Sequence, residues 1–176
     1  MSLCNEIVIS KIEKGFLDKA AKLWSETENS DKENIKKIMS ELYDAEDICG
    51  YMIKGLKKLS KDELIGFIFL SPKISKYLNN NKTPLTSELI KSLLNDVKEK
   101  NLTKPLGTFG MVYINPTYRG RGFGSLIINP AIHTMKESGC KTVMIRTQLK
   151  KFYQQYKFNL LTKGQKEQDL IFYREL

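Results

Sequence analysis

The apolar and polar positions along the chain predict short strands separated by amphipathic helices. Residues 6–12 alternate between apolar and polar side chains, as in a half-buried strand. Residues 16–27 instead place apolar side chains on one face at helical spacing. A second helix is expected after them, because Ser30 and Glu33 stand at the spacing of a capping box. The chain therefore opens with a strand followed by two helices.

The middle of the chain contains one clear strand and two less regular segments. Residues 43–59 fit either a continued helix or a strand over 51–53. Residues 64–70 form a nearly continuous apolar run, which is typical of a strand buried on both faces. Residues 73–105 are interpreted as an insertion that carries one helix over 86–100. Such an insertion either shapes access to a site or decorates the surface.

The most informative stretch is residues 118–125, which are rich in glycine and arginine. They follow the apolar segment 111–116 and open the apolar-periodic segment 126–135, so the order predicts a strand, a tight turn and a helix. Amides at a helix N-terminus lack an intrahelical acceptor, and the helix dipole there favours negative charge. The turn is therefore a candidate site for a phosphate or pyrophosphate.

Three kinds of Gly-rich turn compete for this stretch. A P-loop ends in Gly-Lys-Ser/Thr, and no lysine lies in or just after this turn. A dinucleotide fingerprint needs glycine where Ser125 stands, and only about fifty residues follow, too few for the rest of that fold. The third pattern, Arg/Gln-x-x-Gly-x-Gly/Ala, is matched at every position by Arg119, Gly122 and Gly124.

This third pattern resembles motif A of the GCN5-related N-acetyltransferases, the GNAT superfamily. The resemblance covers residues 107–176, whereas the first hundred residues fit the family only in outline. Five further segments occur in the family's order: 114–116 at the end of its fourth strand, 137–140 closing its third helix, 141–148 as its fifth strand, 152–158 as its fourth helix and turn, and 170–174 as its final strand.

The resemblance implies an α/β fold, the acyl-CoA N-acyltransferase fold, in a single domain over residues 1–176. Its sheet would be mixed, mostly antiparallel and twisted, flanked by helices and splayed between the fourth and fifth strands. Acetyl-CoA would bind in that gap as co-substrate. The implied reaction is acetyl transfer to a primary amine, by direct attack in a ternary complex.

The resemblance also assigns residues to the binding of acetyl-CoA. Backbone groups of the fourth strand, at Val112, Tyr113 and Ile114, would bind the pantetheine arm and the thioester. Gln148, or its neighbour Thr147, would take the place of an asparagine that is common in the family. The turn would bind the pyrophosphate through its backbone amides, at Arg119, Gly120, Arg121, Gly122, Phe123, Gly124 and Ser125.

Tyr153 matches the family's tyrosine that protonates the departing thiolate, which would make it the catalytic general acid. A phenol with an ordinary pKa near 10 suits proton donation to a thiolate at neutral pH. Two alternatives stay open. Tyr153 could be an aromatic of the core, or Phe152 or Tyr156 could be the true match in a shifted register.

The chain departs from the family pattern in other places as well. Lys157 stands where the family has glycine before Phe158, so that turn could be built differently. Pro130 lies inside the predicted third helix and should kink it. The fourth strand has no carboxylate over 108–113, which leaves the general base open between a chain of water molecules and a carboxylate of the first half: Glu46, Asp47 or Glu63.

The composition of the chain gives it a net positive charge but indicates no other kind of function. The net charge of +9 suits an anionic ligand such as coenzyme A. Nucleic acid is disfavoured as a partner, because no stripe of basic residues interleaved with aromatic ones occurs. The single histidine, His133, is expected to be structural or at the surface.

Other sequence features bear on location. No apolar run is long enough for a transmembrane helix, and the first residues lack a signal-peptide pattern, so no membrane partner is expected. The three cysteines form no metal-ligand pattern and predict reduced thiols in a cytoplasmic protein, with no metal site. The chain could act as a homodimer.

Three alternatives stay open beside acetyl transfer. One is the transfer of a longer acyl group. Another is a non-catalytic acyl-CoA-binding or regulatory module of the same fold, which the lack of an evident base favours. Nucleic-acid binding is the third. The fold does not determine the acceptor amine.

Overall fold

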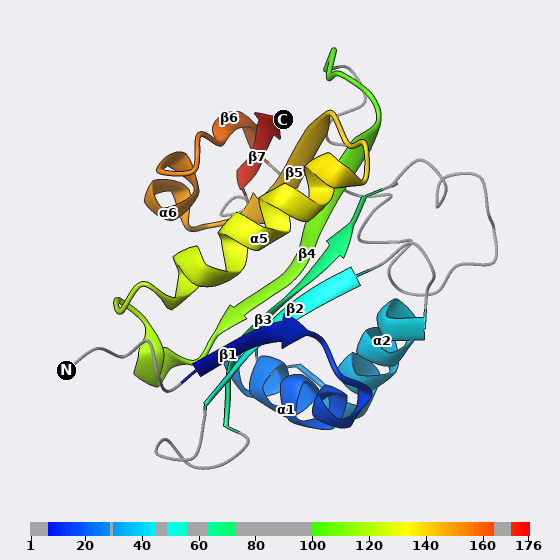
Figure 1. Ribbon diagram of the computed structural model, residues 1–176, viewed down its shortest axis with the longest axis vertical. Coiled ribbons are helices and arrows are strands. Elements are labelled where there is room, and N and C mark those ends of the chain that lie inside the picture. Colours follow the sequence, from blue (N-terminus) through cyan, green and yellow to red (C-terminus); the bar gives the residue numbers. More distant parts are fainter. Residues whose placement is uncertain (1–6, 29, 45–48, 56–62, 73–99, 164–169) are drawn as a thin grey trace. The chain divides into compact units, whose positions relative to one another are not determined.

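The computed structural model describes residues 7–28, 30–44, 49–55, 63–72, 100–163 and 170–176 (Figure 1). The chain forms two compact units, each made of two segments. The first unit consists of Met1–Leu70 and Gly110–His133, and the second of Ser71–Phe109 and Thr134–Leu176. No described helix is long and apolar enough to cross a membrane.

The described residues form both helices and strands, as in an α/β protein. In chain order they are β1 (Ile7–Lys11), the 3-10 helix η2 (Lys14–Phe16), α1 (Leu17–Glu28), α2 (Lys32–Asp44), β2 (Cys49–Gly55), β3 (Leu64–Ser71), β4 (Leu106–Ile114), the 3-10 helix η3 (Pro116–Tyr118), α5 (Phe123–Glu137), β5 (Thr142–Thr147), α6 (Lys150–Gln154), β6 (Asn159–Lys163) and β7 (Leu170–Glu175).

The strands form one mixed sheet in the order β1-β2-β3-β4-β5-β7-β6. β4 and β5 run parallel, through the pairs Leu106–Thr142 to Thr108–Met144. The pairs β1–β2, β2–β3, β5–β7 and β6–β7 are antiparallel. The prediction of a mixed, mostly antiparallel α/β sheet is confirmed.

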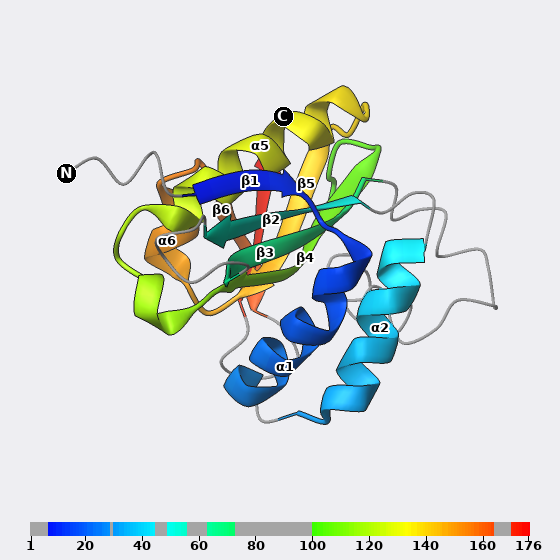
Figure 2. The ribbon, with the colours of Figure 1, turned by 60° about the horizontal axis from the view of Figure 1, so that its bottom comes forward.

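In the first unit, α1 and α2 lie side by side on one face of the strands, and the part of α5 in this unit lies on the other face (Figure 2). The residues between α1, α2 and the strands form one apolar core. It contains Leu17, Ala20, Ala21, Ile35, Ile38, Met39, Met52, Leu64, Phe67, Phe69, Met111 and Tyr113, with Ile12, Phe16, Leu23 and Trp24 packed against it. The predicted apolar face of residues 16–27 therefore faces this core.

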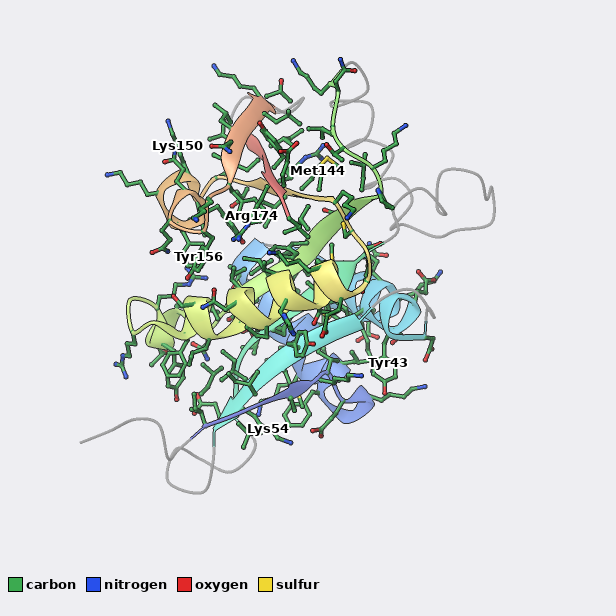
Figure 3. All side chains as sticks on the ribbon, turned by 45° about the horizontal axis from the view of Figure 1, so that its top comes forward. Tyr43, Lys54, Met144, Lys150, Tyr156 and Arg174 are labelled. Atoms are coloured by element: carbon green, nitrogen blue, oxygen red, sulfur yellow. The ribbon has the colours of Figure 1, made fainter. Side chains whose placement is uncertain are left out.

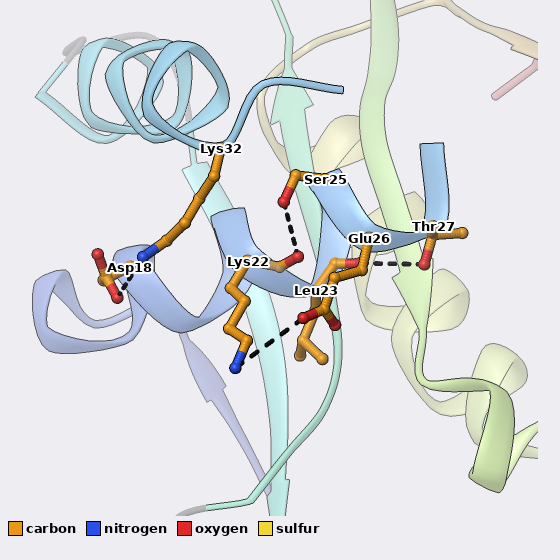
Figure 4. Close-up of polar contacts among 7 residues, drawn as sticks. All are labelled: Asp18, Lys22, Leu23, Ser25, Glu26, Thr27 and Lys32. Atoms are coloured by element: carbon orange, nitrogen blue, oxygen red, sulfur yellow. Dashed lines mark hydrogen bonds and ion pairs between the residues drawn. The ribbon is translucent and has the colours of Figure 1, made fainter. Parts of the chain in front are cut away.

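The start of α2 differs from the sequence prediction. Asp31, not Ser30, caps the helix, because Oδ1 of Asp31 accepts a 2.7 Å hydrogen bond from the amide of Asn34. Lys32 and Lys36 then reach back to α1, where their ammonium groups lie 3.2 Å and 2.9 Å from the carboxylate oxygens of Asp18. Figure 4 shows the contact of Lys32 with Asp18 beside the hydrogen bonds within α1. The bonds from Lys36 and Lys32 lower the pKa of Asp18.

The ambiguous segment 43–59 resolves into the end of a helix and a strand. α2 ends at Asp44, and β2 spans Cys49–Gly55, so the strand interpretation of 51–53 is confirmed. Every residue of β3 is buried, as its apolar run predicted. Most of the proposed insertion at 73–105, including nearly all of its helix, lies outside the described residues.

In the second unit, hydroxyl groups reinforce the contacts of the strands. Oγ1 of Thr108 donates to the carbonyl of Met144 at 3.0 Å, and Oγ1 of Thr142 donates to the carbonyl of Thr103 at 2.8 Å. The strand β6 was not predicted. Its residues are mostly exposed or half-buried, and Leu160 is 46% exposed, so no apolar pattern distinguishes it from a loop.

Candidate functional site

The chain enters the Gly-rich turn from a fixed point at the end of β4. The amide of Asn115 donates to the carbonyl of Ile65 at 2.8 Å, which ties this point to β3. Oδ1 of Asn115 accepts a 3.1 Å hydrogen bond from the amide of Thr117 and so caps η3. Because η3 ends at Tyr118, the next residues form a tight turn that leads directly into α5.

Two glycines give the turn its shape. Gly120 has φ +74° and Gly122 has φ +86°, in the left-handed region that side chains disfavour. A Cβ placed on either glycine would meet no atom of the described residues within 4 Å. Without a Cβ at these two positions, the backbone of the turn is accessible, and a ligand can approach it closely.

The amides of the turn divide into used and unused donors. The amide of Arg119 donates to the carbonyl of Pro116 at 3.2 Å, and that of Ser125 donates to the carbonyl of Gly122 at 3.0 Å. Among the described residues, no acceptor bonds the amides of residues 120–124. These donors precede or begin α5, where the helix dipole adds positive potential. The pyrophosphate prediction thus concerns these inner amides, not the two at the ends.

Two arginines add positive charge to the turn. Nε of Arg119 donates to the carbonyl of Ile114 at 3.0 Å, and the guanidinium of Arg121 lies 5.8 Å from the ring centre of Tyr118. Both residues are exposed. The arrangement of amides and guanidinium groups is suited to an anion with several oxygens.

Tyr118 directly precedes this turn, and the sequence analysis gave it no role in the site. Its phenol donates a 2.7 Å hydrogen bond to Oε2 of Glu63, the residue before β3. Its ring meets that of Phe123 edge-on, with centres 5.7 Å apart. The bond to Glu63, helped by burial, raises the pKa of Tyr118. Glu63, one of the carboxylates considered as a base, is thus bound to a tyrosine.

The predicted β4 residues lie in the same unit as the turn. Val112 and Ile114 are half-buried. Tyr113 is buried, and its ring stacks on that of Phe67 with centres 5.3 Å apart. The carbonyl of Ile114 already accepts the bond from Arg119. The structure therefore brings Val112, Tyr113, Ile114 and residues 119–125 together within the first unit.

Tyr153 belongs to the second unit and is buried in α6, with 2% of its surface exposed. Its ring packs edge-on against Phe152 and Phe158, at 5.0 Å and 5.7 Å between centres. Burial raises the pKa of Tyr153, so the phenol stays protonated throughout the neutral pH range. Tyr156 is half-buried. The phenol of Tyr153 thus has a role in packing, whatever its role in chemistry.

In the turn after α6, Lys157 adopts a left-handed conformation that normally favours glycine. Lys157 adopts φ +63°, and the amide of Phe158 donates back to the carbonyl of Tyr153 at 3.3 Å. The side chain of Arg174 lies beside this turn, where Nη1 donates to the carbonyl of Tyr156 at 2.7 Å (Figure 3). The chain therefore forms a tight turn here with lysine in a left-handed conformation, which is strained for any residue but glycine.

Gln148 lies close to α6 in the chain, also in the second unit. Its side chain is exposed. Its neighbour Thr147 is engaged locally, because Oγ1 accepts a 3.0 Å hydrogen bond from the amide of Leu149. Of the two candidates for the family's asparagine, Gln148 is the one whose side chain shows no such local bond among the described residues.

The remaining expectations concern the base, a metal and the helix α5. Glu46 and Asp47 lie outside the described residues. The described part of the chain contains no group of three or more His, Cys, Asp or Glu that could hold a metal ion. His133 is exposed on α5. α5 is continuous from Phe123 to Glu137 with Pro130 inside it, and the kink there stays a prediction.

Comparison with solved structures supports the same fold. A GNAT-family acetyltransferase from Staphylococcus aureus Mu50 is 14% identical, with a TM-score of 0.66 and coverage of 97% of this chain and 99% of its own. The ribosomal-protein-S18-alanine N-acetyltransferase from Escherichia coli is 13% identical, with a TM-score of 0.60 and coverage of 96% and 93%. PaiA N-acetyltransferase from Thermoplasma acidophilum, solved with coenzyme A, is 17% identical, with a TM-score of 0.54 and coverage of 100% of both chains.

At these identities the likeness to solved structures concerns the fold alone. A search among curated proteins found no match. The sequence itself, however, matches the model of the acetyltransferase (GNAT) family over residues 17–158, which is most of the chain. The match includes the Gly-rich turn and α6. The chain therefore belongs to the GNAT acetyltransferase family.

Proposed function

We propose that this protein is an N-acetyltransferase that moves an acetyl group from acetyl-CoA to a primary amine. The observation that carries the proposal is the row of unused amides at residues 120–124, before and within the start of α5. Unused donors at the start of a long helix are suited to a diphosphate. The coenzyme A bound to the Thermoplasma acidophilum protein of the same fold supports this ligand.

The turn and β4 would hold the acyl donor. The amides of residues 120–124 would bind the diphosphate, with Arg119 and Arg121 adding charge and Ser125 adding a hydroxyl. Backbone groups of Val112, Tyr113 and Ile114 would bind the pantetheine arm, and Gln148 would add a side-chain amide. Acetyl-CoA supplies a thioester, which is an activated acyl group.

In the proposed reaction, the nitrogen of a neutral amine forms a bond to the acetyl carbon, and the bond between that carbon and sulfur breaks. The amine loses one proton, and the thiolate gains one. Tyr153 would donate the latter proton from its phenol. Its raised pKa keeps it protonated but also makes it a weaker acid, so transfer from it requires a basic thiolate.

Cys140 is a buried, free thiol, in keeping with a cytoplasmic enzyme.

One observation favours a second function, a non-catalytic acyl-CoA-binding module. The carboxylate of Glu63 is bound to Tyr118, and β4 carries no carboxylate. In the first function, the amine proton would leave through water or through a carboxylate other than that of Glu63. In the second, no proton transfer is needed.

Two measurements separate these functions. Isothermal titration calorimetry with acetyl-CoA measures binding, and release of free thiol with a panel of primary amines measures transfer. The enzyme should bind acetyl-CoA and release thiol in proportion to at least one amine, with the acetylated product confirmed by mass spectrometry. Binding without turnover on any amine would favour the module. Absence of binding would remove both functions.

A further inference from the structure

Tyr118 is the centre of three contacts that surround the Gly-rich turn. Its phenol donates to Oε2 of Glu63 at 2.7 Å, and its ring meets Phe123 edge-on at 5.7 Å. The guanidinium of Arg121 lies 5.8 Å from the centre of the same ring. Since only 6% of Tyr118 is exposed, one buried side chain joins the start of β3, the turn and the first residue of α5.

The backbone of Glu63 is held in place by a hydrogen bond of its own. Its backbone carbonyl accepts a 2.9 Å hydrogen bond from the amide of Gly55, at the end of β2. Two residues further along, the carbonyl of Ile65 accepts from the amide of Asn115, just before η3. β3 therefore holds the approach to the turn through both a backbone bond and a side-chain bond.

The presence of a carboxylate here needs an explanation, because a negative charge close to an anion site repels the anion. The hydrogen bond to Tyr118 supplies one. A charged acceptor strengthens the bond from the phenol and fixes the ring against rotation out of its place. The fixed ring in turn holds the guanidinium of Arg121, which lies over it.

We propose that Glu63 and Tyr118 are positioning residues for the diphosphate: the carboxylate fixes the phenol, and the fixed ring sets the place of Arg121 and of the first turn of α5. This inference rests on the proposed function of the turn. Neither residue touches the reacting atoms. The pair instead keeps the turn in its binding shape before the ligand arrives, which avoids an ordering cost on binding.

The inference predicts that loss of the bond between Tyr118 and Glu63 weakens the binding of coenzyme A without slowing acetyl transfer. Tyr118→Phe keeps the ring and its contact with Phe123 but removes the bond to Glu63. It should weaken the binding of coenzyme A about tenfold, since the turn then populates other shapes. The KM for acetyl-CoA should rise by a similar factor, whereas kcat should stay the same. Tyr43→Phe, at an exposed tyrosine of α2, is the matched control and should change neither quantity.

Variants of Glu63 test the pair itself. Glu63→Ala should weaken binding as Tyr118→Phe does, and the double variant should be no worse than either single one, because both remove one bond. Glu63→Gln should retain most of the affinity, since an amide oxygen still accepts from the phenol. A residue that merely supported the fold would lower thermal stability and kcat together, and would not be rescued by glutamine.

Calorimetry with coenzyme A, and hydrogen exchange of the free protein, decide the outcome. Tyr118→Phe should speed the exchange of the hydrogen-bonded amides around the turn, those of Arg119, Ser125 and Leu126, in the absence of ligand. Unchanged exchange together with unchanged affinity, in a protein whose parent binds coenzyme A, would overturn this inference and leave the proposed function intact. A parent protein that does not bind coenzyme A would overturn both. Additive losses in the double variant would also overturn the pairing.

Discussion

Nε of Arg119 donates a 3.0 Å hydrogen bond to the backbone carbonyl of Ile114. The arginine that opens the Gly-rich turn is therefore bound to the last residue of β4, the strand proposed to hold the thioester. This bond orients the guanidinium and occupies the carbonyl of Ile114 at the end of the strand. It connects the two parts of the proposed donor site that lie in the first unit.

Replacement of Arg119 tests this link. Arg119→Lys keeps the positive charge but lacks the planar fork of donors, so the affinity for coenzyme A should fall about tenfold. Arg119→Ala should lose more, because the charge is removed as well. Lys37→Ala, which removes one exposed charge from α2, serves as the control in the same calorimetric titration. An Arg119→Ala variant that binds as tightly as the parent would exclude Arg119 from the site.

The bare backbone of the turn gives a second prediction. Gly122→Ala would place a Cβ in the open space where the diphosphate is expected, and coenzyme A affinity should fall about a hundredfold or more. The positive φ should also lower the free energy of unfolding by about 1 to 2 kcal/mol. Gly139→Ala is a matched control, since Gly139 has φ +76° and equally open surroundings. It should show a similar loss of stability with unchanged affinity; a shared loss of affinity would point to strain alone.

Tyr153 can be tested against its neighbour. Tyr153→Phe keeps the aromatic packing, so stability and acetyl-CoA affinity should change little, while kcat falls about a hundredfold if the phenol donates the proton. Tyr156→Phe removes the other phenol of α6 and its turn and should leave kcat unchanged. If Tyr156→Phe is the slow variant instead, the family register is shifted. Steady-state turnover and thermal unfolding of both variants distinguish these results.

Lys157 offers a gain of stability. Glycine there removes the strain of a left-handed lysine, worth about 1 to 2 kcal/mol, and loses about 0.5 to 1 kcal/mol through the freer unfolded chain. Lys157→Gly should therefore raise the free energy of unfolding by about 0.5 to 1 kcal/mol. Lys157→Ala removes the same charge but keeps the strain, so urea unfolding should show no comparable gain. Equal effects of the two variants would assign the change to charge.

The contacts of Asp18 predict a dependence on pH. Lys36 and Lys32 lower the pKa of Asp18 below its ordinary 3.8, so the ionised carboxylate stabilises the fold above pH 3.8. That contribution disappears as the pH falls through the lowered pKa. The difference in unfolding free energy between the parent and Asp18→Asn should be constant near neutral pH and shrink in acid. A difference that grows on acidification would contradict the ion pairs. Because Asp18 is exposed, the effect should be small.

The sequence was sufficient to predict structure where neighbouring residues alone determine the backbone conformation. Gly120 and Gly122 adopt the positive φ that only glycine adopts easily, and the helix begins directly after them. β3 was predictable because it is buried along its whole length. Both features depend on residues that are neighbours in the chain.

The sequence failed where neighbours compete or where contacts come from far away. Ser30 and Asp31 are adjacent capping residues, and the choice between them depends on where the first turn of α2 begins. The bond between Tyr118 and Glu63 joins residues 55 positions apart, and no spacing rule connects a tyrosine before a turn with a carboxylate before a distant strand. Exposed β6 lacked the alternation that identifies other strands.

Three elements belong to both compact units, and the first of them, β3, passes from the first unit to the second between Leu70 and Ser71. β4 passes from the second unit to the first between Phe109 and Gly110, and α5 passes back between His133 and Thr134. No contiguous fragment can therefore contain either unit whole without also cutting into the other. Truncation is therefore a poor way to map activity in this chain, since a fragment that separates the two units would cut through β3, β4 or α5. Point substitutions, or two fragments expressed together, keep both parts of each unit present.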